Sequence, residues 1–344
     1  MISAERLRAI GVSLLEAASV PQADARLVAD SLVEANLRGV DSHGVQHLSV
    51  YMERIRHGVV ELHPTFPVLS EDRGTALLDG QNSLGQVAAM RAMELAIDKA
   101  RDAGIGLVGV RKTNHCGMLA YFTMRAMREG MVGFATCNGP VVMAPWGGKD
   151  KMLSNNPICF AIPTGDQPPI VLDMANSVAA KGKIYAARDK GERIPEGWAL
   201  DKHGRSTMDP SAALDGGSLL PVGGYKGYGL ALVMDVLAGL MTGSAPSQGV
   251  ASLHHDLSRG MELGLLMGAL NVESFVPLAT FQRIVDEYVQ QVRSSTPAPG
   301  STRVYLPGEL EFASRKQRAA EGIPIPSKVW EQLGAWAQEL GVKI

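Results

Sequence analysis

The stretch GIGLVG at residues 104–109 distinguishes between two possible fold classes, one with a glycine-rich dinucleotide-binding turn and one without it. Its glycine spacing is that of the dinucleotide-binding fingerprint, in which a strand ends in a glycine-rich turn and a helix begins. Such a turn binds a diphosphate because the helix directs its N-terminal amides and the positive end of its dipole at the ligand. The order of strand and helix around residues 104–109 therefore tests whether these glycines bind a coenzyme.

The order of the elements does not fit that fingerprint. A segment with helical periodicity, AAMRAMELAIDKARDAG, comes before the glycines, and IGLVGVRK, which starts at Ile105, is itself a β-type run. We therefore expect Gly104 to terminate a helix, and Gly106 and Gly109 to lie in or beside a strand. The sequence predicts that the chain does not have a Rossmann fold.

The residue patterns upstream and downstream of this region differ. Upstream, residues 4–58 show helical periodicity, with a break at Pro21 and another at GVDSHG, which predicts a small helical unit. Downstream, short β-type runs alternate with helices near 117–129 and 278–293, and the tail from residue 309 is again helical. A chain of 344 residues is long enough for two domains.

Composition excludes several classes of function. Apolar residues make up 46% of the chain and charged residues 20%, as in globular proteins. The 33 basic and 35 acidic side chains are interspersed, so no basic block indicates a nucleic-acid partner. The apolar stretch GLALVMDVLAGLMTG, which starts at Gly229, is too short to cross a membrane and is expected to form a buried helix. We expect neither nucleic acid nor membrane as a partner.

Cysteine usage and the N-terminal sequence favour a cytoplasmic protein. Cys116, Cys137 and Cys159 form no CxxC pair, so neither a disulfide framework nor a zinc knuckle is indicated. MISAERLRAI carries charges where a signal peptide needs an apolar run. LHHDL, residues 253–257, could suggest a metal, but adjacent histidines on one segment do not readily face the same ion. We predict no metal site.

The segment DSHGVQH, residues 41–47, carries the first candidate for proton transfer. It places Ser42 and His43 at a break between helices. A histidine at a helix N-terminus has a lowered pKa because the dipole favours its neutral form, and such a group exchanges protons near neutral pH. The alternative is that Asp41 or Ser42 merely caps the helix and His43 is exposed.

Two further segments could bind an anion. TNHCGM places Asn114, His115 and Gly117 after a strand and at a helix start, where free amides can receive a ligand, although Asn114 could simply be the N-cap. GGYKGYG, residues 223–229, combines a flexible backbone with one lysine, but it lacks the full phosphate-binding loop motif. Each signal is weak by itself.

Read together, these segments resemble the malate/L-lactate dehydrogenase family of the second type, which has ureidoglycolate, sulfolactate and diketogulonate relatives. The similarity runs from about residue 38 to 325. The stretches that carry it are DSHGVQHL, TNHCGMLAYF, SNNPICFAIP, VLDMANS, GKIYAARDKGERIPEGWALDKHGRSTMDP, LLPVGGYKGYGLALVMDVLAG and YLPGE.

The resemblance implies an α+β fold of the sulfolactate-dehydrogenase-like type. A helical domain would consist of residues 1–75 and 310–344. Residues 76–309 would form a domain on a mostly antiparallel sheet that binds NAD or NADP, in agreement with the exclusion of a Rossmann fold. The family also implies a homodimer.

The resemblance also implies which residues contact the coenzyme. They lie in the loops and strand ends of the larger domain and would include His115, Cys116, Gly117, Met118, Leu119, Ala120, Asn138, Gly139, Leu172, Asp173, Met174, Tyr225, Lys226, Gly227, Pro307, Gly308 and Glu309. The family reaction is hydride transfer between the nicotinamide C4 and the C2 of a 2-hydroxy or 2-oxo acid such as malate, lactate or ureidoglycolate. Reduction of a cyclic imine such as piperideine- or pyrroline-2-carboxylate is an alternative, and so is coenzyme binding without catalysis.

By the same resemblance, His43 would exchange the substrate proton, with Ser42 orienting its ring. His115 is a second candidate for this role, because in the ureidoglycolate branch the residue at the equivalent position is assigned as catalytic. We place His43 first. Many members have an arginine where this chain has His47, so either Lys181 or Lys183 would bind the substrate carboxylate, or the substrate is bulkier or less acidic than malate.

Overall fold

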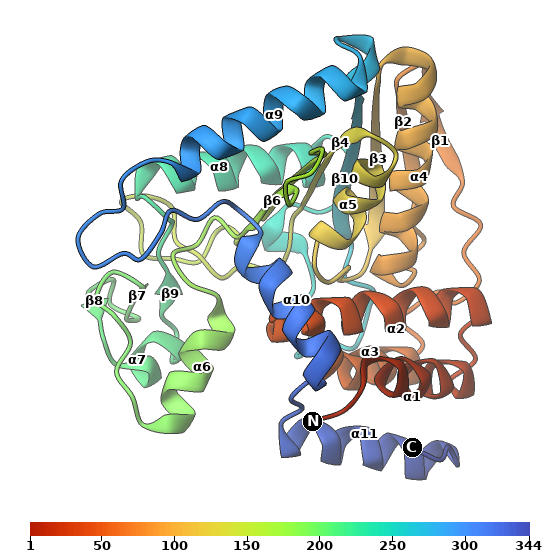
Figure 1. Ribbon diagram of the computed structural model, residues 1–344. Coiled ribbons are helices and arrows are strands. Elements are labelled where there is room, and N and C mark those ends of the chain that lie inside the picture. Colours follow the sequence, from red (N-terminus) through yellow and green to blue (C-terminus); the bar gives the residue numbers. More distant parts are fainter.

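The computed structural model describes residues 1–344 and is built around a seven-stranded sheet (Figure 1). The strand order is β1-β2-β3-β10-β4-β5-β6, and only the pair β2 and β3 is parallel. The strands are β1 (Val68–Glu71), β2 (Thr75–Asp79), β3 (Ile105–Thr113), β4 (Met131–Cys137), β5 (Ile158–Ile162), β6 (Ile170–Met174) and β10 (Leu263–Asn271). The predicted mixed fold on a mostly antiparallel sheet is confirmed.

The glycines of GIGLVG lie at a helix end and in a strand, as predicted. Helix α4 (Gly85–Ala103) ends at Gly104, which has φ +81° and donates its N–H to the carbonyl of Ala100. Gly106 and Gly109 belong to β3. A Cβ at Gly106 would lie 1.9 Å from the carbonyl oxygen of Ala96, so this glycine lets α4 pack closely on the sheet.

The two faces of the sheet are covered by different helices. Helices α4 and α5 (Ala120–Arg128) pack on one face, and α8 (Tyr225–Asp235) with its π-helical continuation (Val236–Leu240) packs on the other. The central strand β10 is buried on both faces and reads LGLLMGALN. Its apolar residues do not alternate with polar ones, which is why the sequence analysis did not identify this strand.

The helices from the two ends of the chain pack together (Figure 1). The bounds are α1 (Ala4–Ala17), α2 (Gln22–Leu37), α3 (Leu48–Arg56), α10 (Glu309–Glu321) and α11 (Ser327–Leu340), with one-turn 3-10 helices at Asp41–His43 and Val45–His47. Helix α10 contacts α2, while α11 contacts α1 and α3. The helices share one core of 54 buried apolar residues with the sheet. Residues 68–71, inside the predicted helical segment 1–75, form strand β1 instead.

A smaller unit within residues 76–309 has its own core. It comprises α6 (Lys181–Lys190), α7 (Pro210–Leu214) and a three-stranded sheet of β7 (Ala199–Leu200), β8 (Ser206–Thr207) and β9 (Ser218–Leu219). Eight buried apolar side chains fill it, among them Met143, Ile184 and Leu219. The sequence analysis did not separate this unit, because strands of two residues have no periodic signal.

The apolar stretch from Gly229 is helical but only half-buried, so the prediction of a buried helix was wrong for one face. Ala231 and Met234 are buried, whereas the other face exposes Leu230, Leu232, Val233, Val236, Leu240 and Met241. The last helix, α9 (Leu278–Arg293), is strongly amphipathic and also leaves Ile284 and Tyr288 exposed. None of the helices combines the length and the hydropathy that crossing a membrane requires.

Candidate active site

Four histidines from separate parts of the sequence converge at one place. The ring centroids of His43 and His115 are 5.7 Å apart, those of His47 and His115 are 4.8 Å apart, and those of His47 and His254 are 6.0 Å apart. His43 and His47 come from the two 3-10 turns, His115 follows β3, and His254 precedes β10. The segments DSHGVQH and TNHCGM therefore contribute to a single site, which we call the histidine cluster.

The turn that carries His43 is held from outside. Asn36 donates to the carboxylate of Asp41 and accepts from the N–H of Val45, and Arg318 of α10 donates to Asp41 at 2.7 Å. Ser42 Oγ lies 3.0 Å from His43 Nδ1. Neither Asp41 nor Ser42 caps a helix, so the alternative of simple capping does not apply.

His115 is oriented by a buried hydrogen-bonded chain. Its Nδ1 lies 2.6 Å from the hydroxyl of Tyr51, which accepts a hydrogen bond of 3.0 Å from Gln86 Nε2. Tyr51 is 3% exposed and Gln86 is fully buried. The hydroxyl of Tyr51 can donate to Nδ1 of His115 or accept from it, depending on which ring nitrogen carries the proton, and in both cases the contact leaves Nε2 free to face a ligand.

Tyr51 and Gln86 were not among the site residues predicted from the sequence. Tyr51 lies one helical turn after His47 on α3, so the two side chains share a face of that helix. This spacing was a usable signal for Tyr51. No local pattern singled out Gln86, the second residue of α4.

Burial favours the neutral form of each histidine in the cluster. Burial lowers the pKa of His43, and burial together with the neighbouring His47 and His43 lowers the pKa of His115 well below its ordinary value. For His47, burial and then His43 and His254 lower the pKa to about 3. The sequence analysis predicted the direction for His43, but the cause is burial and not a helix dipole.

Of the two arrangements considered for the start of helix α5, the structure contradicts the cap by Asn114. Asn114 donates to the carbonyls of Asn82 and Ser83, far from the helix start, so it is not the N-cap. The first amide of the helix, on Ala120, donates to the carboxylate of Asp173 at 2.8 Å. Burial raises the pKa of Asp173 to about 6, against the opposing effect of this hydrogen bond.

Three of the segments predicted to contact a coenzyme lie together. The contact between Ala120 and Asp173 joins the loop 116–120 to the end of β6. The N–H of Val171 donates to the carbonyl of Pro307, which brings the segment 307–309 to the same strand. The carboxylate of Glu309 is already paired with Arg293 and Arg303 and accepts from the N–H of Leu306.

Other predicted contact residues have structural partners. The amide of Asn138 donates to Asp235 and to the carbonyl of Ala245 and accepts from the N–H of Gly264, so its side chain joins β4, α8 and β10. Gly139 follows it and is buried. Tyr225, Lys226 and Gly227 form the first turn of α8, where Tyr225 and Lys226 are exposed.

The two predicted carboxylate-binding lysines differ in position. Lys181 begins α6 and lies near enough to His254 for its charge to lower the pKa of that histidine. Lys183 is exposed and has no recorded contact with the histidine cluster. Asn176, in the quoted stretch VLDMANS, is buried. Its side chain donates to the carbonyl of Asn156, a contact that stabilises the fold.

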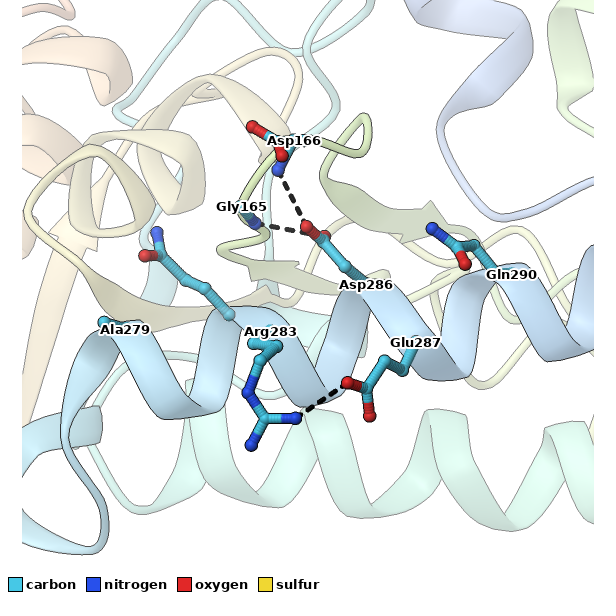
Figure 2. A pocket seen from close by; sticks show the side chains of 8 residues that line it. Gly165, Asp166, Ala279, Arg283, Asp286, Glu287 and Gln290 are labelled. Atoms are coloured by element: carbon cyan, nitrogen blue, oxygen red, sulfur yellow. Dashed lines mark hydrogen bonds and ion pairs between the residues drawn. The ribbon is translucent and has the colours of Figure 1, made fainter.

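A separate depression of about 360 Å³ lies between α9 and the loop at Gly165 (Figure 2). Asp286 accepts hydrogen bonds from the backbone N–H groups of Gly165 and Asp166 there, so its carboxylate stabilises the turn. The lining is almost wholly polar and contains no member of the histidine cluster. No three histidine, cysteine, aspartate or glutamate side chains are grouped so that they could hold a metal ion.

Comparison with known proteins places these residues in context. The family model described as malate/L-lactate dehydrogenase matches residues 2–334. A malate dehydrogenase of Pyrococcus horikoshii is 40% identical over 98% of this chain and 95% of its own length. The NAD(+) ureidoglycolate dehydrogenase of Escherichia coli O157:H7 is 36% identical over 96% of this chain and 94% of its own. The solved sulfolactate dehydrogenase of Methanocaldococcus jannaschii superposes with a TM-score of 0.94 at 37% identity and covers 99% of this chain and 98% of its own.

Proposed function

This chain belongs to the malate/L-lactate dehydrogenase family, and from that premise we propose that it transfers a hydride between the nicotinamide C4 of NAD or NADP and the C2 of a 2-hydroxy or 2-oxo acid. Relatives are named as dehydrogenases of malate, sulfolactate and ureidoglycolate, with NAD(+) or NADP(+). The observation that carries the proposal is the convergence of His43 and His115, each with a hydroxyl on its Nδ1.

The residues present suit a dinucleotide. Gly223 and Gly224 have φ +60° and +67°, and a Cβ at Gly223 would meet no atom within 4 Å, so this backbone is open to a ligand. The exposed Lys226 follows directly, and backbone amides with one cation are a donor set for a diphosphate. We infer that this turn and the segments 116–120, 172–174 and 307–309 hold the coenzyme, as loops around the sheet and not as a Rossmann turn.

The buried chain of Gln86, Tyr51 and His115 makes His115 the best-supported proton-transfer group. When bound, the coenzyme supplies or accepts the hydride at C4 of its nicotinamide. In reduction, His115 reacts as the imidazolium: it gives its Nε2 proton to the carbonyl oxygen and is left neutral with its proton on Nδ1. In oxidation, the neutral ring with its proton on Nδ1 takes the proton of the substrate hydroxyl on Nε2. A phenol can donate to Nδ1 or accept from it, so Tyr51 holds the ring before and after the proton moves.

His43 and Ser42, placed first by the sequence, form a second pair beside His115. Ser42 orients the His43 ring as the resemblance implied, but this hydroxyl is not buried and has no further residue behind it. We therefore propose that His43 hydrogen-bonds the substrate oxygen and that His115 exchanges the proton. We propose that the substrate carboxylate meets His47, whose ring is near those of His115 and His254, and Lys181 at the start of α6. The exposed Lys183 is a weaker candidate for this contact.

We expect Tyr51→Phe to move the acid limb of the pH profile for hydroxy-acid oxidation. The hydroxyl of Tyr51 accepts from Nδ1–H of the reacting His115 ring and stabilises the imidazolium more than the neutral ring. Without it, the pKa of His115, which burial and the neighbouring histidines already lower, falls further. Oxidation needs the neutral imidazole, so the acid limb moves to a lower pH than in the wild type. The measurement is kcat/KM against pH, with Tyr288→Phe, an exposed tyrosine of α9, as control.

The activity is tested by following loss of the near-ultraviolet absorbance of NADH and NADPH with a panel of 2-oxo acids and cyclic imines. One solved structure with this fold is a delta1-piperideine-2-carboxylate reductase, which is why imines belong in the panel. Turnover of a 2-oxo acid supports the proposal. Tight coenzyme binding without turnover of any compound would contradict the proposal and favour the alternative that the protein binds the coenzyme without catalysis.

We propose that the active form is a homodimer that covers the exposed face of α8. Val233, Val236, Leu240 and Met241 form a contiguous apolar row on that helix and its π-helical continuation, as expected of an interface. We expect the chain to sediment with the mass of two copies and Val233→Asp to shift it to one copy. Val68→Asp, on the edge strand β1, serves as a control with an equally exposed side chain. A wild-type monomer would contradict this assignment.

We also propose the two-domain division, with the terminal helices as one domain and the coenzyme on the sheet domain. The cytoplasm remains our expected location. All three cysteines are free and buried, which suits a reducing compartment.

A further inference from the structure

We propose that His254 is a specificity-determining residue that recognises a second acidic group on the substrate, and that Arg54 positions it. This inference rests on the proposed hydroxy-acid activity and names its substrate class: 2-hydroxy acids with an acidic group on C3 in addition to the carboxylate on C1. The LHHDL motif that carries His254 has no other assigned role in the fold or the reaction.

One face of helix α3 connects the site to this histidine. His47, Tyr51 and Arg54 follow each other at spacings of four and three residues, so their side chains lie along the same side of the helix. His47 and Tyr51 both reach His115. Arg54, one turn later, is 1% exposed, which is exceptional for an arginine and indicates a specific role.

Arg54 fixes the loop 252–259. Its Nη1 donates to the carbonyl of Asp256 at 2.8 Å, and its Nη2 donates to the carbonyl of Arg259 at 2.8 Å. Nη1 also lies 3.5 Å from the carbonyl of Ser252, whose Oγ accepts from the N–H of His255. The planar guanidinium thus holds both ends of the short segment that carries His254, and places that ring 6.0 Å from His47.

The charges around His254 lack a negative partner. The groups that face it are His47 from the second 3-10 turn, His115 after β3, Arg54 from α3, the adjacent His255, and Lys181 from α6. All of these are neutral or positive. The nearby carboxylate of Asp256 is taken by Ser258 and Arg259 of its own loop. An anion supplied by the substrate would therefore be the first negative charge at this end of the cluster.

This arrangement takes the place of the arginine that the family often has at position 47. His47 is too desolvated to carry a charge, and partial burial, His255, Lys181 and Arg54 lower the pKa of His254 in the free protein. A carboxylate or sulfonate beside His254 favours the charged imidazole and raises that pKa. Binding of a diacid is therefore coupled to uptake of a proton by His254, whereas binding of a monoacid is not.

The test uses calorimetry on the full chain saturated with reduced coenzyme, so that no turnover occurs. Malate and lactate, which differ by the carboxylate on C3, are the probes, each in buffers of different ionisation enthalpy. We expect malate to bind more tightly and to take up protons, and His254→Ala to weaken malate binding at least about 10-fold with little change for lactate. His203→Ala, which removes an exposed histidine outside the cluster, should match the wild type.

Two further variants separate recognition from folding. His254→Lys keeps a positive charge and should restore malate affinity without proton uptake. Arg54→Met should weaken malate binding like His254→Ala if the arginine acts through the loop. Equal binding of malate and lactate by the wild type, or unchanged malate binding in His254→Ala, would overturn the proposal. Failure of the hydroxy-acid activity itself is seen separately, as absence of turnover across the whole panel.

Discussion

Replacement of His115 by glutamine should lower kcat by roughly a hundredfold or more, while the coenzyme still binds with nearly wild-type affinity. Glutamine keeps a side chain of similar length and can hydrogen-bond Tyr51, but it cannot exchange a proton near neutral pH. The measurement is steady-state turnover in both directions, together with titration of the reduced coenzyme by fluorescence. An intact kcat would remove His115 from the reaction.

The same substitution at His43 distinguishes the two candidates. If His43 only hydrogen-bonds the substrate oxygen, His43→Gln raises KM more than it lowers kcat. A loss of kcat in His43→Gln that exceeds the loss in His115→Gln would return the proton-transfer role to His43, the residue that the sequence placed first. His203→Gln, an exposed histidine outside the cluster, serves as the control for both variants.

The second large effect is structural: Gly106→Ala should destabilise the protein by about 3 kcal/mol. Its methyl group would lie 1.9 Å from the carbonyl oxygen and 2.7 Å from the carbonyl carbon of Ala96, and both belong to the backbone of α4. Relief requires α4 to move away from β3, because no side-chain rotamer can change to make room. Urea unfolding followed by circular dichroism measures the loss.

Gly334→Ala is the matched control for this effect. Gly334 lies within α11, where an added Cβ meets no atom within 4 Å, so alanine should leave stability unchanged or raise it by up to about 1 kcal/mol. Coenzyme affinity of the folded Gly106→Ala protein should equal that of the wild type. Normal stability with lost coenzyme binding would instead indicate that Gly106 approaches a ligand.

Much of the fold could be predicted because its local signals agree. The helical periodicity before Gly104 and the β-type run after it set the order of α4 and β3, and the structure has this order. Pro21 correctly marked the start of α2. The features that were not predicted had weak or misleading signals. Strand β10 is apolar on both faces and shows no alternation. The apolar stretch from Gly229 indicated a buried helix, but one face of it is exposed in the single chain.

The candidate site was partly readable. His43 and His115 lie in recognisable motifs, but they are 72 positions apart (115 − 43). The sequence could not show that the fold brings their rings to 5.7 Å from each other. Gln86 reaches Tyr51 only because the tertiary fold brings the start of α4 to α3, and no local sequence pattern indicates this contact. His254 belongs to the motif LHHDL, which was considered as a possible metal site and gave no other indication of its role. Its approach to His47 depends on the anchoring of its loop by Arg54.

The most direct measurement of the central claim is a crystal structure with reduced coenzyme and a non-reacting 2-oxo acid analogue. We predict that the nicotinamide ring lies beside His115 and His43, with the diphosphate near Lys226 and the loops around the sheet. A diphosphate bound at Gly104, Gly106 and Gly109, or a nicotinamide remote from both histidines, would contradict it.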